Sequence, residues 1–196
     1  MKLIVITRPD FYASEVEQIL SLLQHGLEYL HLRKPEATPQ EISDLLDQIP
    51  SALHPHIVLH EHFALSQQYA VRGVHLNRRH ALPPTGFRGE VSRSCHSLEE
   101  VKEWKPQCSY LFLSPIFDSI SKQGYTAAFS PQQLAEACSQ GIIDRQVVAL
   151  GGITCERIGT LKAMGFGGAA LLGDVWQQSE AQFLPHFLEL RKEALL

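Results

Sequence analysis

The sequence predicts an α/β protein whose eight parallel strands close into a (β/α)8 TIM barrel. Eight short runs of strand-forming residues alternate with amphipathic segments, and the runs are almost continuously apolar, as in strands covered on both faces. The last two runs each stop at glycine. The chain has 196 residues. Because a TIM barrel typically takes roughly 200–250 residues, we expect one compact domain over residues 1–196.

The expected elements follow in order along the chain. Strands are expected at residues 2–7, 29–33, 57–60, 73–76, 91–95, 110–114, 147–150 and 168–172. Helices are expected at residues 14–24, 39–48, 63–69, 98–104, 131–138, 155–164 and 180–194. In the first helix Val16, Ile19 and Leu23 share one face. Ser97 followed by Glu100 resembles a capping box that opens the helix at 98–104.

The connection between the fourth and fifth strands differs from the others. Residues 77–90 are rich in Pro, Gly and Arg and are too irregular for a full helix. We therefore expect an abbreviated fourth βα crossover.

Composition excludes several classes of protein. The net charge of -4 does not favour nucleic-acid binding, which usually needs a concentrated basic surface. No apolar stretch approaches the roughly 20 residues that cross a bilayer, and residues 1–8 read as a strand rather than a signal peptide. A cytoplasmic location is the simplest expectation. The scattered cysteines, without a Cys-x-x-Cys pair, predict buried free thiols at Cys95, Cys108, Cys138 and Cys155.

The glycines that end the last two strands predict a phosphate site. Gly151, Gly152 and Gly173 follow strands at the end of a βα series, where glycine allows backbone N–H groups to approach an anion closely. In TIM barrels the last two such turns often form a phosphate site on the catalytic face. The alternative is that these glycines only make tight turns.

Histidines gather where the predicted strands end. Of the ten histidines, five lie at these ends: His31, His60, His62, His75 and His96. Imidazole titrates near neutrality, so the concentration of histidines at the strand ends favours a site that binds an anionic ligand and transfers protons. A zinc site made of His60, His62 and His75 is an alternative that no His-x-x-x-His or Cys-x-x-Cys spacing supports.

The loop after the sixth strand carries a second candidate for anion binding. Ser119, Ser121 and Lys122 lie in this long loop, and their hydroxyl and ammonium groups suit the oxygens of a phosphate or pyrophosphate. Long loops in a compact barrel are often functional lids. A merely solvated loop is the alternative.

Several motifs together resemble the thiamine phosphate synthase family, which includes the thiazole tautomerases. The motifs span nearly the whole chain, and they are His31-Leu-Arg33, Ser94-Cys-His-Ser97, Ser114-Pro-Ile-Phe-Asp-Ser-Ile-Ser-Lys122, Leu150-Gly-Gly-Ile-Thr154 and the turn at Gly173. The resemblance implies a barrel that joins a hydroxyethylthiazole phosphate to an aminopyrimidine diphosphate and releases pyrophosphate.

The resemblance also implies residue roles. Gly152 and Gly173, with their backbone neighbours such as Gly151, would hold the thiazole phosphate. Ser94 would lie beside the pyrimidine. The pyrophosphate would face Arg33, Ser119, Ser121 and Lys122.

The sequence departs from the synthase pattern at the expected metal ligands. The second strand reads His31-Leu-Arg33-Lys34-Pro35 instead of Gln-x-Arg-x-Lys, so its lysine is displaced by one residue. The third strand ends in His60-Glu61 where Asn-Asp is expected, and His80 takes the place of a second acid. Glu61 is the one carboxylate expected to bind Mg²⁺.

These departures leave three hypotheses open. The first is a synthase-type transferase with Mg²⁺ as cofactor. The second is a metal-independent thiazole tautomerase. Its usual histidine at the end of the sixth strand is Pro115 here, so His31, His60 or His96 would supply the acid–base group. The third is a catalytically silent binder of thiazole or thiamine phosphate. All three imply a phosphorylated small molecule as ligand, with homo-oligomerisation left open.

Overall fold

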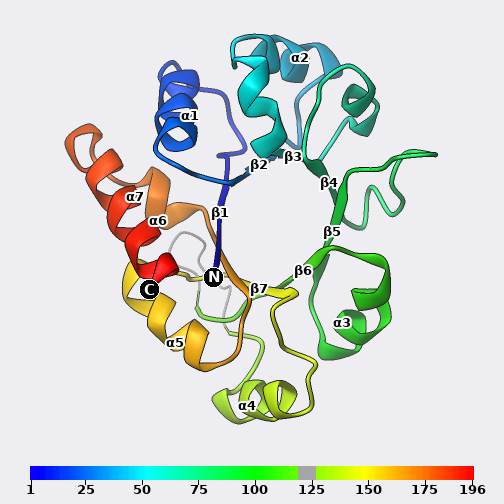
Figure 1. Cartoon of the computed structure of the whole chain (residues 1–196), viewed down its shortest axis with the longest axis vertical. Helices are drawn as coiled ribbons and strands as arrows, with labels where there is room; N and C mark the ends of the chain where they lie inside the picture. Colours follow the sequence, from blue (N-terminus) through cyan, green and yellow to red (C-terminus); the bar gives the residue numbers. More distant parts are fainter. Residues whose placement is uncertain (119–126) are drawn as a thin grey trace.

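The protein is a closed barrel surrounded by helices. The computed structural model describes residues 1–118 and 127–196. Its eight strands are all parallel, each pairs with the next along the chain, and β8 pairs with β1 (Figure 1). The helices lie outside this ring (Figure 1). The predicted TIM barrel is therefore confirmed.

The elements have the following bounds. The strands are β1 Lys2–Ile6, β2 Tyr29–Leu32, β3 Ile57–Leu59, β4 Gly73–Leu76, β5 Glu90–Cys95, β6 Tyr110–Leu113, β7 Val147–Leu150 and β8 Gly168–Leu171. The α-helices are α1 Glu15–Gln24, α2 Pro39–Asp47, α3 Leu98–Trp104, α4 Pro131–Ser139, α5 Ile158–Ala163, α6 Gly173–Trp176 and α7 Glu180–Leu195. Short 3-10 helices are η1 Ser51–His56, η2 Phe63–Gln67, η3 Lys105–Gln107 and η4 Cys155–Arg157. Every predicted strand is present.

Helical segments differ more from the prediction. Residues 63–69 were expected to form an α-helix, but only the 3-10 helix η2 forms there, after His62 in the left-handed conformation with φ 51°. The expected helix at 155–164 divides into η4 and α5, and η1, η3 and α6 were not expected. Short 3-10 turns have poorer hydrogen-bond geometry and weaker sequence signals than α-helices, and α6 has only four residues, which explains these errors.

The capping box at α3 is only half formed. The Ser97 hydroxyl accepts the backbone N–H of Glu100 at 3.1 Å, as predicted. The Glu100 carboxylate instead accepts the N–H of His96 at 2.6 Å, one residue earlier than the reciprocal bond of a capping box.

The abbreviated fourth crossover is confirmed. Residues 77–89 contain no helix and project from the barrel between β4 and β5 (Figure 1). Leu82 in this segment is 75% exposed. No helix therefore connects β4 to β5, and α3, which follows β5 in the chain, packs against β5 and β6.

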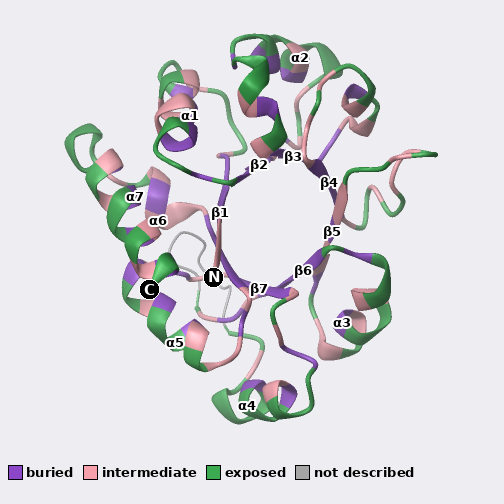
Figure 2. Ribbon diagram, in the orientation of Figure 1, coloured by how far each residue is buried: buried purple, intermediate pink, exposed green. Residues whose placement is uncertain are grey.

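Two apolar layers hold the fold together. The larger lies between the strands and the inner faces of the helices, which are buried only on the side toward the barrel (Figure 2). The smaller fills the barrel interior and includes Tyr29, Tyr110 and Phe112. The four cysteines are free thiols, as predicted, but only Cys95, Cys108 and Cys155 are buried, while Cys138 is partly exposed. No helix in the described part of the chain has the length and apolar character needed to span a membrane.

A buried ion pair joins the first two βα units at the carboxyl ends of the strands. Lys34 follows β2 and its ammonium donates to Glu15 Oε1 at 2.5 Å and to the Asp10 carbonyl at 2.7 Å. Both side chains are almost inaccessible, with relative exposures of 0% for Lys34 and 2% for Glu15. The backbone N–H of Lys34 also donates to Glu61 Oε2 at 3.0 Å, so the segment after β3 is tied to the same point.

We expect Lys34→Met to lower the free energy of unfolding by about 3–5 kcal/mol, because it leaves the Glu15 carboxylate buried without its partner. Urea denaturation measures this change. The double variant Lys34→Met/Glu15→Gln removes both charges and should recover part of the loss. Arg8→Met, which breaks an exposed ion pair with Asp10, should change stability little. Equal losses in the single and double variants would contradict the buried-charge explanation.

Candidate active site

A cavity of about 450 Å³ opens at the carboxyl ends of the strands. This is the end of a TIM barrel at which active sites are found. Its volume lies within the range of roughly 300–1,000 Å³ that holds small-molecule ligands. Six of the predicted site residues line it, and they are Arg33, His60, Ser94, Gly151, Gly152 and Gly173.

The other predicted site residues lie elsewhere. His31 is fully buried directly behind His60. Glu61 is 6% exposed, is absent from the cavity lining, and uses one carboxylate oxygen to accept the N–H of Lys34. The predicted residues Ser119, Ser121 and Lys122 lie outside the described part of the chain.

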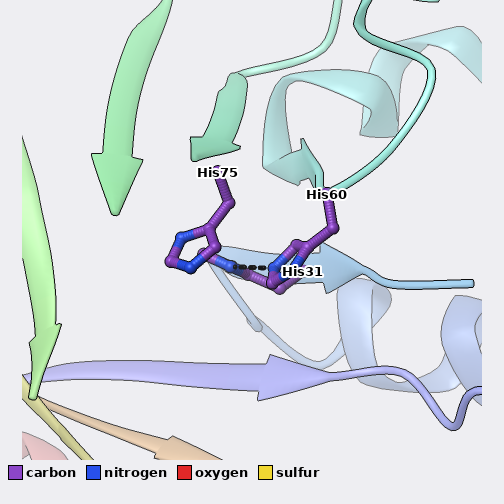
Figure 3. A group of neighbouring side chains, drawn as sticks. All are labelled: His31, His60 and His75. Carbon is purple, nitrogen blue, oxygen red and sulfur yellow. Dashed lines mark hydrogen bonds between the residues drawn. The ribbon is translucent and has the colours of Figure 1, made fainter. Parts of the chain in front are cut away.

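Three histidines converge at the floor of the cavity. His31 comes from β2, His60 follows β3 and His75 lies in β4 (Figure 3). His31 Nδ1 is hydrogen-bonded to His60 Nε2 at 2.9 Å. The rings of His60 and His75 are stacked, with centroids 4.3 Å apart and planes 20° apart. Only His60 and His75 reach the cavity surface.

Neighbouring side chains fix the orientation of these rings. His31 Nε2 is hydrogen-bonded to the Tyr110 hydroxyl at 2.8 Å, and Phe112 stacks on His31 with a centroid distance of 4.9 Å. His75 lies between two serine hydroxyls, with Nδ1 2.8 Å from Ser92 Oγ and Nε2 2.8 Å from Ser94 Oγ. Each ring is therefore held by at least one hydrogen bond from its own neighbours.

Burial keeps the three imidazoles neutral. It lowers the pKa of His31 and His60 well below the usual 6.5, and the proximity of His75 adds to the effect on both rings, as does Arg33 for His60. It lowers the pKa of His75 to about 3, with Arg33 and Arg93 contributing. A neutral imidazole has one N–H donor and one lone pair. The floor of the cavity therefore offers both a proton donor and a proton acceptor at neutral pH.

Sequence reasoning named His75 as a strand-end residue and as a member of the alternative zinc set, and it did not identify Tyr110. Tyr110 opens β6 and contacts His31 from 79 positions away in the sequence. Polar residues inside otherwise apolar strands, such as His75 in Gly73–Leu76, were the available signal. Contacts of this kind across a barrel have no local sequence pattern.

The alternative zinc set of His60, His62 and His75 differs in one member from the histidines that the structure brings together. His62 is turned away from the cluster, and its Nε2 is hydrogen-bonded to the Ala37 carbonyl at 2.6 Å. His31 takes its place beside His60 and His75. Of the other histidines, His54 is buried against the carbonyls of Leu46 and Ile49.

The turn after β7 requires its two glycines. Gly151 has φ +99° and Gly152 has φ +62°, which is left-handed backbone that other residues rarely adopt. A Cβ on Gly152 would lie 2.2 Å from the Asp118 carbonyl oxygen, and a Cβ on Gly151 would lie 2.9 Å from Pro115 Cα. The geometry of the turn is therefore sufficient to explain both glycines. Because they also line the cavity wall, the hypothesis that they bind a phosphate remains open.

The charged groups around the cavity favour an anionic ligand. Four arginines line it, and they are Arg33, Arg78, Arg79 and Arg93. Arg93 is also stacked on the Trp104 ring, 3.9 Å from its centroid. Two carboxylates line the cavity as well, and both have partners: Glu100 accepts the His96 N–H, and Asp174 lies 2.7 Å from His186 Nε2.

Comparisons with known proteins agree on one family. The family model described as Thiamine monophosphate synthase matches residues 3–175. A crystal structure of thiamine phosphate pyrophosphorylase from Bacteroides thetaiotaomicron is 42% identical, covers 100% of this chain and 98% of that chain, and has a TM-score of 0.90. A thiamine-phosphate synthase from Yersinia pestis (strain Pestoides F) is 29% identical over 186 residues, 86% of this chain and 84% of that protein. One from Bacteroides fragilis (strain YCH46) is 26% identical over 190 residues, 88% of this chain and 90% of that protein.

We expect the free energy of unfolding to fall as the pH drops from 7 to 5.5. The unfolded chain protonates these histidines near pH 6.5, whereas the folded protein does so only at lower pH, at about 3 for His75. Each buried histidine should therefore contribute about 1 kcal/mol to the loss in this window. Urea denaturation at the two pH values measures it.

The variant His75→Gln isolates one histidine in that experiment. Its stability should depend less on pH than that of the parent protein, by about 1 kcal/mol over the same window. An identical pH dependence in the two proteins would mean that His75 is protonated in the folded state and that burial does not keep it neutral.

Proposed function

Because the chain belongs to the thiamine monophosphate synthase family, we propose that it joins a hydroxyethylthiazole phosphate to an aminopyrimidine diphosphate. In this reaction the bond between the pyrimidine methylene carbon and the diphosphate oxygen breaks. The thiazole nitrogen then donates its electron pair to that carbon, so that thiamine phosphate and pyrophosphate are formed. The observation that carries the proposal is the gathering of Arg33, Ser94 and the two glycine turns around one cavity.

Each of these residues has a proposed role. The Arg33 guanidinium offers a planar set of donors for the leaving diphosphate, whose developing charge it would stabilise. Ser94, held by His75, would position the pyrimidine. Backbone N–H groups at Gly151, Gly152 and Gly173 would bind the thiazole phosphate. From the sequence pattern, Ser119, Ser121 and Lys122 would add contacts to the diphosphate.

The donor set does not fit the Mg²⁺ site that the family resemblance implies. Mg²⁺ prefers oxygen ligands, and two carboxylates are expected near the ends of β3 and β4. Glu61 stands at the first position, but it is absent from the cavity lining and one of its carboxylate oxygens accepts the N–H of Lys34, so the neighbouring His60 faces the cavity there. His80 stands at the second. We therefore assign no step to a protein-bound Mg²⁺ ion and propose that Arg33 stabilises the negative charge of the leaving diphosphate.

A metal-independent tautomerase is the second candidate, and the histidine network favours it. His60 lines the cavity, and its Nε2 is connected through His31 to the Tyr110 hydroxyl. His60 would take a proton from a carboxythiazole phosphate on its other ring nitrogen, and the hydrogen bond to His31 would stabilise the imidazolium that forms. It would then return that proton to another atom of the substrate, as the shift of a double bond requires.

Two assays separate the candidates. Thiazole phosphate and aminopyrimidine diphosphate are mixed with the protein, with and without Mg²⁺, and released pyrophosphate and thiamine phosphate are measured. Formation of both products supports the synthase. If neither forms, carboxythiazole phosphate is supplied alone and its isomerisation is followed by NMR. Turnover there supports the tautomerase, and binding without turnover in either assay identifies a silent binder.

For the synthase, we expect Arg33→Lys to raise KM for the pyrimidine diphosphate by about tenfold, because lysine keeps the charge but loses the two-pronged contact with phosphate oxygens. Steady-state pyrophosphate release measures it. Arg88→Lys is the matched control, since Arg88 is exposed and outside the cavity lining. An unchanged KM in Arg33→Lys would remove Arg33 from the diphosphate site.

A further inference from the structure

The three-histidine cluster has the composition of a metal centre. One ring nitrogen from each of His31, His60 and His75 lies within 4.8 Å of the other two. The three residues come from neighbouring parts of the barrel, at β2, the end of β3 and β4 (Figure 3). We propose that His31, His60 and His75 bind one divalent transition-metal ion of the Zn²⁺ or Co²⁺ class at the floor of the cavity.

The chemistry of the donors selects this class of ion. Imidazole nitrogen suits Zn²⁺, Co²⁺ and related ions, whereas Mg²⁺ requires oxygen. Three histidines with a fourth position left open are the ligand set of some catalytic zinc sites. The proposed site is therefore distinct in donors and in ion from the Mg²⁺ site expected of the family.

The state of the histidines is suited to metal binding. All three are buried, with exposures of 0% for His31 and His75 and 4% for His60. A metal ion binds the lone pair of a neutral imidazole, so the hydrogen that lies between His31 Nδ1 and His60 Nε2 would move to the other nitrogen of its ring when the ion enters. Side chains held in place by packing also lose little conformational freedom on binding.

The neighbours supply the outer contacts that metal-binding histidines normally have. A ligating imidazole usually donates its second N–H to an oxygen, which fixes the ring. Tyr110 occupies this place for His31 at 2.8 Å, and the hydroxyls of Ser92 and Ser94 lie at the two nitrogens of His75. One of these serines would remain bound to His75 when its other nitrogen turns to the ion.

The adjustment that binding requires is small. Nitrogens bound to one tetrahedral Zn²⁺ at about 2.0–2.1 Å lie about 3.3 Å apart. His31 Nδ1 and His60 Nε2 are already 2.9 Å apart, and the ion would replace the hydrogen bond between them. The ligand nitrogen of His75 lies at most 4.8 Å from those of His31 and His60. Rotation of the His75 ring away from its stack on His60 would bring this nitrogen closer to the other two.

The open position would take an anion from the cavity. Three neutral imidazoles leave the charge of the ion uncompensated, and Arg33 in the cavity wall adds to it. An oxygen anion would therefore complete the site, and His60 and His75 face the cavity from which a phosphate group would arrive. The binding site itself does not depend on the proposed function, because metal binding is measured without any substrate.

The test uses the untagged full-length protein after treatment with a chelator. CoCl2 and ZnCl2 are titrated separately, with isothermal calorimetry for both ions and visible absorption for Co²⁺. We expect one ion per chain and a Co²⁺ spectrum of low coordination number with nitrogen ligands. MgCl2 at the same concentration should not displace Co²⁺.

Variants locate the site. His31→Gln, His60→Gln and His75→Gln should each weaken Co²⁺ binding by at least about tenfold, and circular dichroism checks that each variant folds. His96→Gln is the matched control, because His96 lines the same cavity outside the cluster and should leave the affinity unchanged. Tyr110→Phe keeps all three ligands, and it should weaken binding less than the loss of a ligand.

Two results would overturn the proposal. One is the absence of stoichiometric binding of either ion to the parent protein, which would make the cluster a hydrogen-bonded network only. The other is an affinity that stays the same in all three cluster variants or falls equally in His96→Gln, which would place the ion elsewhere. Neither result bears on pyrophosphate release, so the proposed function is judged separately.

Discussion

A closed barrel of eight strands has an interior only wide enough for its own side chains, and this limit determines what the floor of the cavity is made of. Polar groups placed there are removed from water and must satisfy one another. His31 does so by bonding to His60 on one side and to Tyr110 on the other. The chemistry that His60 offers to a ligand in the cavity is therefore set by two residues that lie behind it, outside the cavity lining.

The same need to pair buried polar groups explains the ion pair of Lys34 with Glu15 at this end of the barrel. Lys34 is displaced by one residue from the position of the family's lysine, and a one-residue shift after a strand turns a side chain to the opposite face. Its ammonium is found in the buried pair with Glu15 instead of among the cavity-lining residues. The Lys34 ammonium thus stabilises the fold, and the neighbouring Arg33 is the cationic residue after β2 that lines the cavity.

Much of the fold could be predicted from the sequence, because strand formation in this barrel depends on local features. Apolar runs such as Val147–Leu150 indicate burial on both faces of the strand. The irregular segment 77–90 indicates that no helix connects the fourth and fifth strands. The 3-10 helix Phe63–Gln67 was mistaken for an α-helix because both present apolar residues at similar spacing.

The site was predictable only in part. Strand order alone brings Arg33, His60, Ser94 and the glycine turns to one end of the barrel, since the carboxyl ends of parallel strands meet there. The direction of each side chain is a separate matter. His62 and His31 are both strand-end histidines in the sequence, yet tertiary packing turns one toward the Ala37 carbonyl and the other into the cluster.

Proton transfer and metal binding make competing demands on His60. Proton transfer by His60 needs its Nε2 to stay hydrogen-bonded to His31, because that bond stabilises the imidazolium that forms when the other ring nitrogen takes a proton. Binding of an ion between the same two nitrogens removes that bond, and the charge of the ion disfavours a second positive charge on the ring. The two states of the cluster therefore exclude each other. A tautomerase would need the ion absent, whereas a transferase, whose bond-breaking step transfers no proton, is compatible with either state.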